Sequence, residues 1–149
     1  MSGQLTHSPA DVLRHALIEL GKGTLPTANG DWPIFVGGEP NKPDNCITCK
    51  DTDGIQEGRD MTSGYMQEHE GVQLRIRAVD HQTGWDRSQL LMAALDTLIS
   101  YLTVSIDSST YSLEAVTRTT NIINLGKDTT TSKLNVFTIN VIVALTQLS

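Results

Sequence analysis

The chain has 149 residues, 38% hydrophobic and 19% charged, with a formal net charge of -6 at pH 7. A chain of this length fits one domain that buries roughly 70% of the surface exposed when unfolded, so it needs no disulfide or metal to hold it together. The acidic balance argues against a protein that grips nucleic acid through its phosphates, because such proteins present a concentrated basic surface.

Residues 1–4 lack the basic flank and apolar block of a targeting segment, and unbroken apolar runs such as residues 141–145 are too short to span a bilayer. We therefore expect a protein that is made and kept in the cytoplasm and does not bind membranes.

The first helix is expected to start at Ser8. Ser8 can cap free amides, Pro9 fits the first turn, and Asp11 suits the positive end of the helix dipole. An apolar stripe at helical spacing follows, and Gly21 supplies the stop. The stripe consists of Val12, Leu13, Ala16, Leu17 and Leu20.

A short strand is expected at residues 32–36, and an extended connection over 37–44 leads to a second strand at 45–51. This strand holds Cys46 and Cys49, a lone C-x-x-C pair. A zinc site takes four ligands, and the four histidines are scattered singly along the chain. Strand residues three apart also point to opposite faces, so we expect two reduced thiols rather than a metal or redox pair.

Residues 52–70 look least like packed structure because they contain few apolar anchors. One basic residue, Arg59, accompanies six acidic ones in this stretch and at the position before it. These are Asp51, Asp53, Glu57, Asp60, Glu68 and Glu70. A long loop in a compact domain is usually functional or disordered. Two alternatives remain: a solvated hairpin arm, or a flexible loop that becomes ordered only against a partner.

Residues 71–79 alternate apolar and polar side chains, which predicts a half-buried strand. Val72, Leu74, Ile76 and Ala78 share one face, and Gln73, Arg75 and Arg77 share the other. Like charges on one strand face repel each other unless nearby carboxylates compensate them. Glu114 or another carboxylate could do so on a solvated face. Alternatively, Arg75 and Arg77 pair with carboxylates of another subunit, which the acidic stretch 51–70 of that subunit supplies.

A second helix is expected from about 84 to 101, with Thr83 and Asp86 at capping-box spacing. Strands are then expected at 102–106, 111–124 and 134–148, with a polar hairpin tip at 126–132. This order predicts an α+β fold, in which two helices pack on one face of a mostly antiparallel mixed sheet. The expected core comprises Leu13, Leu17, Leu20, Val72, Leu74, Ile76, Leu91, Leu95, Leu98, Ile99, Phe137, Ile139, Val141 and Val143.

Motifs for catalysis and metal binding fail on inspection. A calcium loop starting at Asp51 would need glycine at its sixth position and glutamate at its twelfth, where the chain has Gln56 and Thr62. Gly126-Lys127 is followed by Asp128, so a phosphate loop is excluded. No nucleophile, base and orienting group can be named. We expect no enzyme activity, metal or cofactor.

Four short motifs stand in the middle of the chain: Pro43-Asp44-Asn45, Asp51-Thr52-x-Gly54, Gly58-Arg59-x-Met61-x-x-Gly64, and residues 71–77. Together they resemble minor capsid proteins of tailed bacteriophages. In length and element order the chain is similar to the tail terminator proteins of long-tailed phages, from about Trp32 to the C-terminus.

The resemblance implies a small virion subunit that forms a hexameric ring at the head-proximal end of the tail. Such a ring caps the tail tube, ends its elongation and offers a surface to the head-tail connector protein, while DNA passes through without specific binding. Arg75, Arg77, Arg59 and the acidic residues of 51–70 would then contact other subunits or the tube protein. The alternatives are another connector or neck protein, or a small ligand-binding or catalytic α+β domain, which would be a monomer or dimer with an apolar pocket.

Overall fold

The computed structural model describes residues 6–26, 30–40, 44–59, 66–97, 102–127 and 134–147, with backbone alone for 53–59, 66–69, 97 and 114. These residues form two helices, α1 (Pro9–Glu19) and α2 (His81–Thr97), and seven strands. The strands are β1 (Ile34–Val36), β2 (Cys46–Arg59), β3 (Met66–Ala78), β4 (Leu102–Ile106), β5 (Ser109–Arg118), β6 (Ile123–Lys127) and β7 (Asn135–Gln147).

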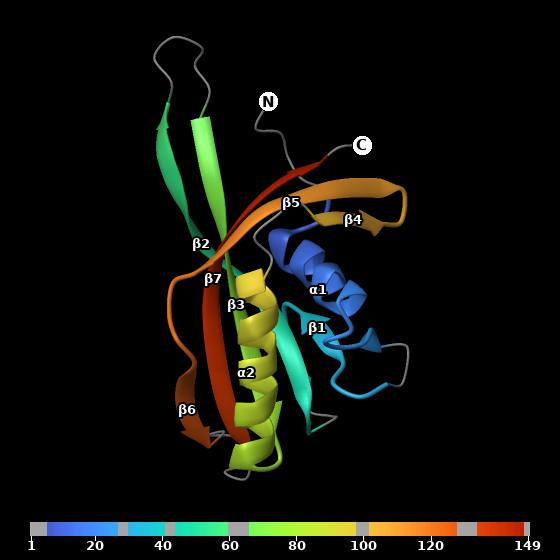
Figure 1. Cartoon of the computed structure of the whole chain (residues 1–149), viewed down its shortest axis with the longest axis vertical. Coiled ribbons are helices and arrows are strands. Elements are labelled where there is room, and N and C mark those ends of the chain that lie inside the picture. The colour runs from blue at the N-terminus through green and yellow to red at the C-terminus, as the bar shows by residue number, and fades with distance from the viewer. Residues whose placement is uncertain are drawn as a thin grey trace.

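The strands form one curled sheet in the order β1-β2-β3-β7-β5-β4, with β6 also paired to β7. The β1–β2 pair is parallel, and the other pairs are antiparallel. Both helices lie against the same face of the sheet, where α1 contacts β2 and β4 and α2 contacts β3 and β7 (Figure 1). The predicted α+β class and the placement of the helices are therefore confirmed. Neither described helix is long and apolar enough to cross a membrane.

The core lies between the helices and this face. Val72, Leu74 and Ile76 of β3 are fully buried beside their register partners on β7. These partners are Val141, Ile139 and Phe137. The helices add Leu13, Leu17, Leu91 and Leu95, all with no exposed surface. The predicted placement of Leu20 in the core is wrong. Leu20 is 37% exposed because it follows the last turn of α1. Leu98 and Ile99 lie outside the described residues.

The ends of the helices follow from local hydrogen bonds. Ser8 caps α1 as predicted, since its hydroxyl accepts a hydrogen bond from the Asp11 amide at 3.3 Å. Gly21, with φ of 76°, closes α1 in a left-handed turn. The predicted start of α2 at about residue 84 is wrong, because the carboxylate of Asp80 accepts the Thr83 amide at 2.8 Å and begins the helix at His81.

The strand predicted over residues 111–124 is interrupted. β5 ends at Arg118 and β6 begins at Ile123, and both pair with the same edge of β7. Between them, the Thr120 hydroxyl accepts a hydrogen bond from the Asn140 amide at 3.3 Å. The Asn140 amide thus bonds to a side-chain hydroxyl instead of a main-chain carbonyl. The ladder of main-chain hydrogen bonds along this edge of β7 is therefore interrupted. Gly126 and Lys127, expected in a hairpin tip, belong to β6; residues 128–133 lie outside the description.

Candidate functional site

The acidic stretch 52–70 forms a hairpin arm in its described parts. β2 continues to Arg59 and β3 starts at Met66, so the described parts pair as a hairpin, which is one of the two alternatives; the flexibility of the stretch stays a prediction. We call residues 53–59 and 66–69 the arm. β3 pairs with β7 only from Glu70 onward, so the two strands of the arm pair only with each other among the described residues. Figure 1 shows the arm leaving the body of the sheet as a two-stranded ribbon.

The predicted interface residues of the acidic stretch fall into four groups. Asp53, Glu57, Arg59 and Glu68 have backbones in the arm, and Asp60 lies outside the described residues. Glu70 is half-buried at the base of the arm, where it pairs in register with Val143. Asp51 serves the fold itself: its carboxylate accepts a hydrogen bond from the Ala10 amide at 2.9 Å. A carboxylate at this position stabilises the positive end of α1.

Arg75 and Arg77 are paired within the chain. Arg75 Nε donates to Glu39 Oε2 at 2.7 Å, and a terminal nitrogen of Arg77 lies 3.3 Å from Glu39 Oε1. The Arg77 side chain is only 4% exposed, and its Nε also donates to the Asp44 carbonyl at 3.2 Å. The expectation that another subunit supplies the carboxylates is therefore replaced by an internal pair, because the segment after β1 folds back over this face of the sheet.

This cluster changes how the arginines can be tested. Exposed residues tolerate charge reversal with little loss of stability, and the alternating pattern alone placed Arg77 among them. At 4% exposure, a glutamate at position 77 would face Glu39 in a nearly closed site. Reversal would then unfold the chain rather than report on assembly.

Cys46 and Cys49 lie on opposite faces of β2, as predicted, and both are buried and free. Burial raises the pKa of Cys46 to about 11, although the nearby Arg77 guanidinium opposes the shift. Burial raises the pKa of Cys49 to about 12, with Arg14 opposing it. Both thiols are therefore protonated at neutral pH and poorly suited to nucleophilic or redox chemistry. Among the described residues, no group of three or more histidine, cysteine or acidic side chains could hold a metal.

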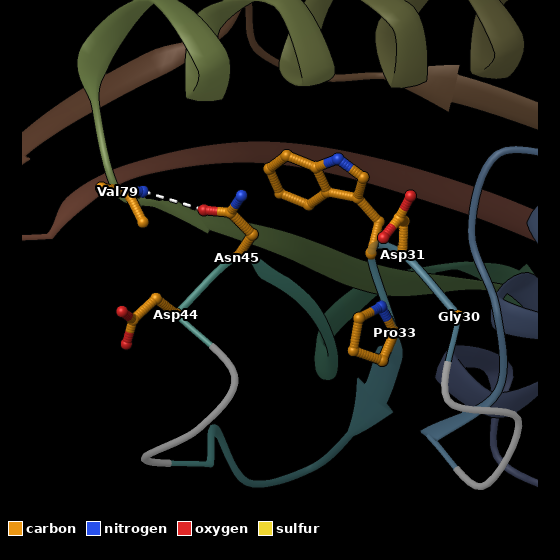
Figure 2. Close-up of a pocket in the computed structure, with 7 residues that line it drawn as sticks. Gly30, Asp31, Pro33, Asp44, Asn45 and Val79 are labelled. Atoms are coloured by element: carbon orange, nitrogen blue, oxygen red, sulfur yellow. Dashed lines mark hydrogen bonds between the residues drawn. The ribbon is translucent and has the colours of Figure 1, made fainter.

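A pocket of about 480 Å³ lies next to the arginine cluster and shares Asp44 with it. Its walls come from three segments: residues 30–33 before β1, residues 44–45 before β2, and Val79 after β3. Figure 2 shows Asp31 and Asp44 on the two sides of the pocket, with Pro33 and Asn45 between them. Asn45 Oδ1 accepts a hydrogen bond from the Val79 amide at 2.9 Å, which joins two of the segments.

Trp32 contributes to this pocket from a strained backbone. Its φ is 54°, a left-handed value that is an outlier for a bulky side chain. A main-chain hydrogen bond stabilises this strained conformation: the Thr24 amide donates to the Trp32 carbonyl at 3.2 Å. The Arg87 guanidinium lies 4.8 Å from the centroid of the indole. Burial lowers the pKa of Arg87, and the charge of Asp31 opposes this shift.

Sequence reasoning did not identify the pocket or Glu39. Asn45 and Val79 are 34 positions apart, and Glu39 is 36 positions from Arg75, so only the tertiary fold brings them together. The sequence signal for Glu39 was indirect: Arg75 and Arg77 place like charges on one strand face, which calls for a nearby carboxylate. In sequence comparisons, no protein-family model and no curated protein matches the chain.

Proposed function

We propose that this chain is a structural, non-enzymatic subunit that assembles into a ring and caps the tail tube of a long-tailed phage. In this role it would end tube elongation and offer a surface for joining the head. The proposal rests on the resemblance of four motifs to tail terminator proteins and on the α+β fold that the resemblance implies. The observation that carries it furthest is the arm.

Described residues of three of the four motifs behind the resemblance lie on the β2–β3 hairpin. Residues 51–54 and 58–59 belong to β2, and residues 71–77 lie in the second half of β3. This hairpin therefore contains both the central strand that orders the core and the arm that leaves the sheet.

The arm has the properties of a contact surface. A two-stranded ribbon without a third strand or a helix is at best marginally stable in water. β1 pairs with β2 only at residues 47–49, so the outer edge of β2 beyond Cys49 has no strand partner in the described part of the chain. Unpaired edges readily accept a further strand or a partner protein. A closed ring uses two different patches on each subunit, and the arm is suited to be one of them.

The direct test removes the arm, its tip and Glu70 at its base, and leaves the rest of the sheet. In this variant Asn-Gly replaces residues 53–70, so that a two-residue turn joins Thr52 to its register partner Gly71. We expect circular dichroism to show a folded chain, while electron microscopy shows no capped tail tubes. A matched control keeps the length of the arm and removes charge through Asp53→Asn, Glu57→Gln and Glu68→Gln. Loss of capping in both variants would assign the contact to charge, and loss in the deletion alone would assign it to the strands.

The biological test uses a phage that lacks the protein. Tail tubes should overgrow or fail to join heads, and supplying the full chain should restore normal tails. Tubes of normal length that still join heads would exclude the terminator role. A defect confined to joining, with normal tube length, would favour a connector or neck protein instead.

A further inference from the structure

We propose that the pocket between Asp31 and Asp44 receives the Lys127 side chain of a neighbouring copy of this chain, and that this contact joins subunits in the ring. The inference rests on the proposed function, because it names the two surfaces through which the ring closes.

The pocket has the chemistry of a lysine site. Asp31 and Asp44 lie on its two sides and give it acidic character, and Trp32, Pro33 and Val79 supply apolar walls. A lysine buries its methylene stem along apolar surface while its ammonium group seeks carboxylates. A volume of about 480 Å³ also leaves room for an apolar neighbour of the lysine.

Hydrogen bonds within the chain hold the pocket walls in place without a partner. The buried Arg77 holds the Asp44 carbonyl at 3.2 Å, and the Val79 amide holds Asn45 at 2.9 Å. On the other side, the Thr24 hydroxyl donates to the Asp31 carbonyl at 3.1 Å. Preorganised walls of this kind reduce the entropy lost on binding.

The edge of the sheet at β6 presents the matching surface. Lys127 is exposed at the end of β6 and makes no ion pair within the described part of the chain. Leu125, two positions earlier, is 51% exposed, and Val79 in the pocket is 52% exposed. They are the two most exposed large hydrophobic side chains of the described chain, and one lies on each surface. Contact between copies would cover both.

The positions of the two surfaces suit a ring. Lys127 pairs in register with Asn135 of β7, and Asn135 pairs with Ala78 of β3, the residue before Val79. Both surfaces therefore lie at the same end of the central strands. They are on opposite sides of the β3–β7 pair, as the places of β6 and β1 in Figure 1 show. Two different patches at one level allow each copy to contact the next around a closed ring.

The experiment measures assembly of the full chain by light scattering and electron microscopy at low ionic strength. Asp31→Lys and Lys127→Glu should each weaken assembly by at least about tenfold, because each places like charges together. The double variant exchanges the charges and should recover most of the loss. Asp31→Asn removes the charge without adding a cation beside Arg87, and Glu19→Lys reverses an exposed charge elsewhere as the matched control. Circular dichroism establishes that each variant is folded.

The outcomes separate this inference from the proposed function. Closed rings that are insensitive to Asp31→Asn and Lys127→Glu would overturn the inference and leave the ring intact. Single variants that weaken assembly without recovery in the exchanged pair would also overturn it, because the two residues would then meet different partners. A chain that stays monomeric both alone and with tail tubes would contradict the inference and the proposed function together.

Discussion

Replacing Glu39 by glutamine tests the charge cluster on the outer face of the sheet. The substitution keeps the shape of the side chain and removes the charge that faces two guanidinium groups, 2.7 and 3.3 Å away. Arg77 is 4% exposed, and an uncompensated buried charge costs about 3–5 kcal/mol. Arg75 is 26% exposed, so solvent reduces its share to about 0–1 kcal/mol. Because Arg77 keeps its bond to the Asp44 carbonyl, we expect a total loss of about 2–4 kcal/mol.

Urea unfolding measures this loss as a lower midpoint with an unchanged slope. Thermal unfolding should give a fall of roughly 4–16 °C, at about 2–4 °C per kcal/mol for a domain of this size. Protein concentration must be held constant, since assembly adds stability. The control Glu19→Gln alters an exposed carboxylate and should stay within about 0.5 kcal/mol. A loss in Glu39→Gln no larger than in this control would refute the argument that Glu39 compensates a buried charge.

Three further predictions concern the core and the thiols. Leu95→Ala should lower the free energy of unfolding by about 2–5 kcal/mol, because Leu95 has no exposed surface; urea unfolding measures it. Gly84→Ala should cost about 1–3 kcal/mol in the same assay, since the added Cβ would lie 2.5 Å from a ring carbon of Phe137. Cys46 and Cys49, with pKa values raised to about 11 and about 12, should react with iodoacetamide far more slowly at pH 8 in the folded chain than in urea. The rate should rise with pH, because the reactive thiolate forms only as pH approaches the raised pKa.

Matched controls accompany these predictions. Leu90→Ala removes a side chain that is 38% exposed on the same helix and should cost much less than Leu95→Ala. Gly38→Ala adds a Cβ with nothing within 4 Å and should leave stability nearly unchanged. If a variant and its control lost equal free energy of unfolding, the packing assigned to that side of α2 would be wrong. Rapid labelling of both thiols in the folded chain would contradict their burial.

The elements that the sequence predicted correctly are those specified by local patterns. Residues 71–79 alternate along β3, and Ser8 and Gly21 mark the ends of α1 through contacts within a few residues. The arm was harder to predict, because residues 53–59 and 66–69 show no sustained alternation of apolar and polar residues. The break between β5 and β6 depends on the Thr120 hydroxyl meeting a residue 20 positions away.

The candidate sites depended still more on tertiary structure. The arginine-bearing face of β3 was correctly identified as needing carboxylates, but the carboxylate that accepts from both arginines is Glu39, which lies in an extended connection rather than in the acidic stretch. The pocket combines three segments that no local rule relates. Asp51 was assigned to an interface because of its charge, whereas its position beside the N-terminus of α1 gives it a role in the fold.

The place of β7 in the sheet has a consequence for folding. β7 is the last described strand along the chain, yet it lies between β3 and β5 and also pairs with β6. During synthesis, the β2–β3 and β4–β5 hairpins emerge first. The edges of β3 and β5 that pair with β7 in the finished sheet are then still unpaired. The two halves of the sheet can join only after residues 135–147 have left the ribosome, so a nascent chain lacks the finished sheet until then. Completion of the sheet should therefore be slow relative to the folding of helical proteins, because its central pairings join distant parts of the sequence.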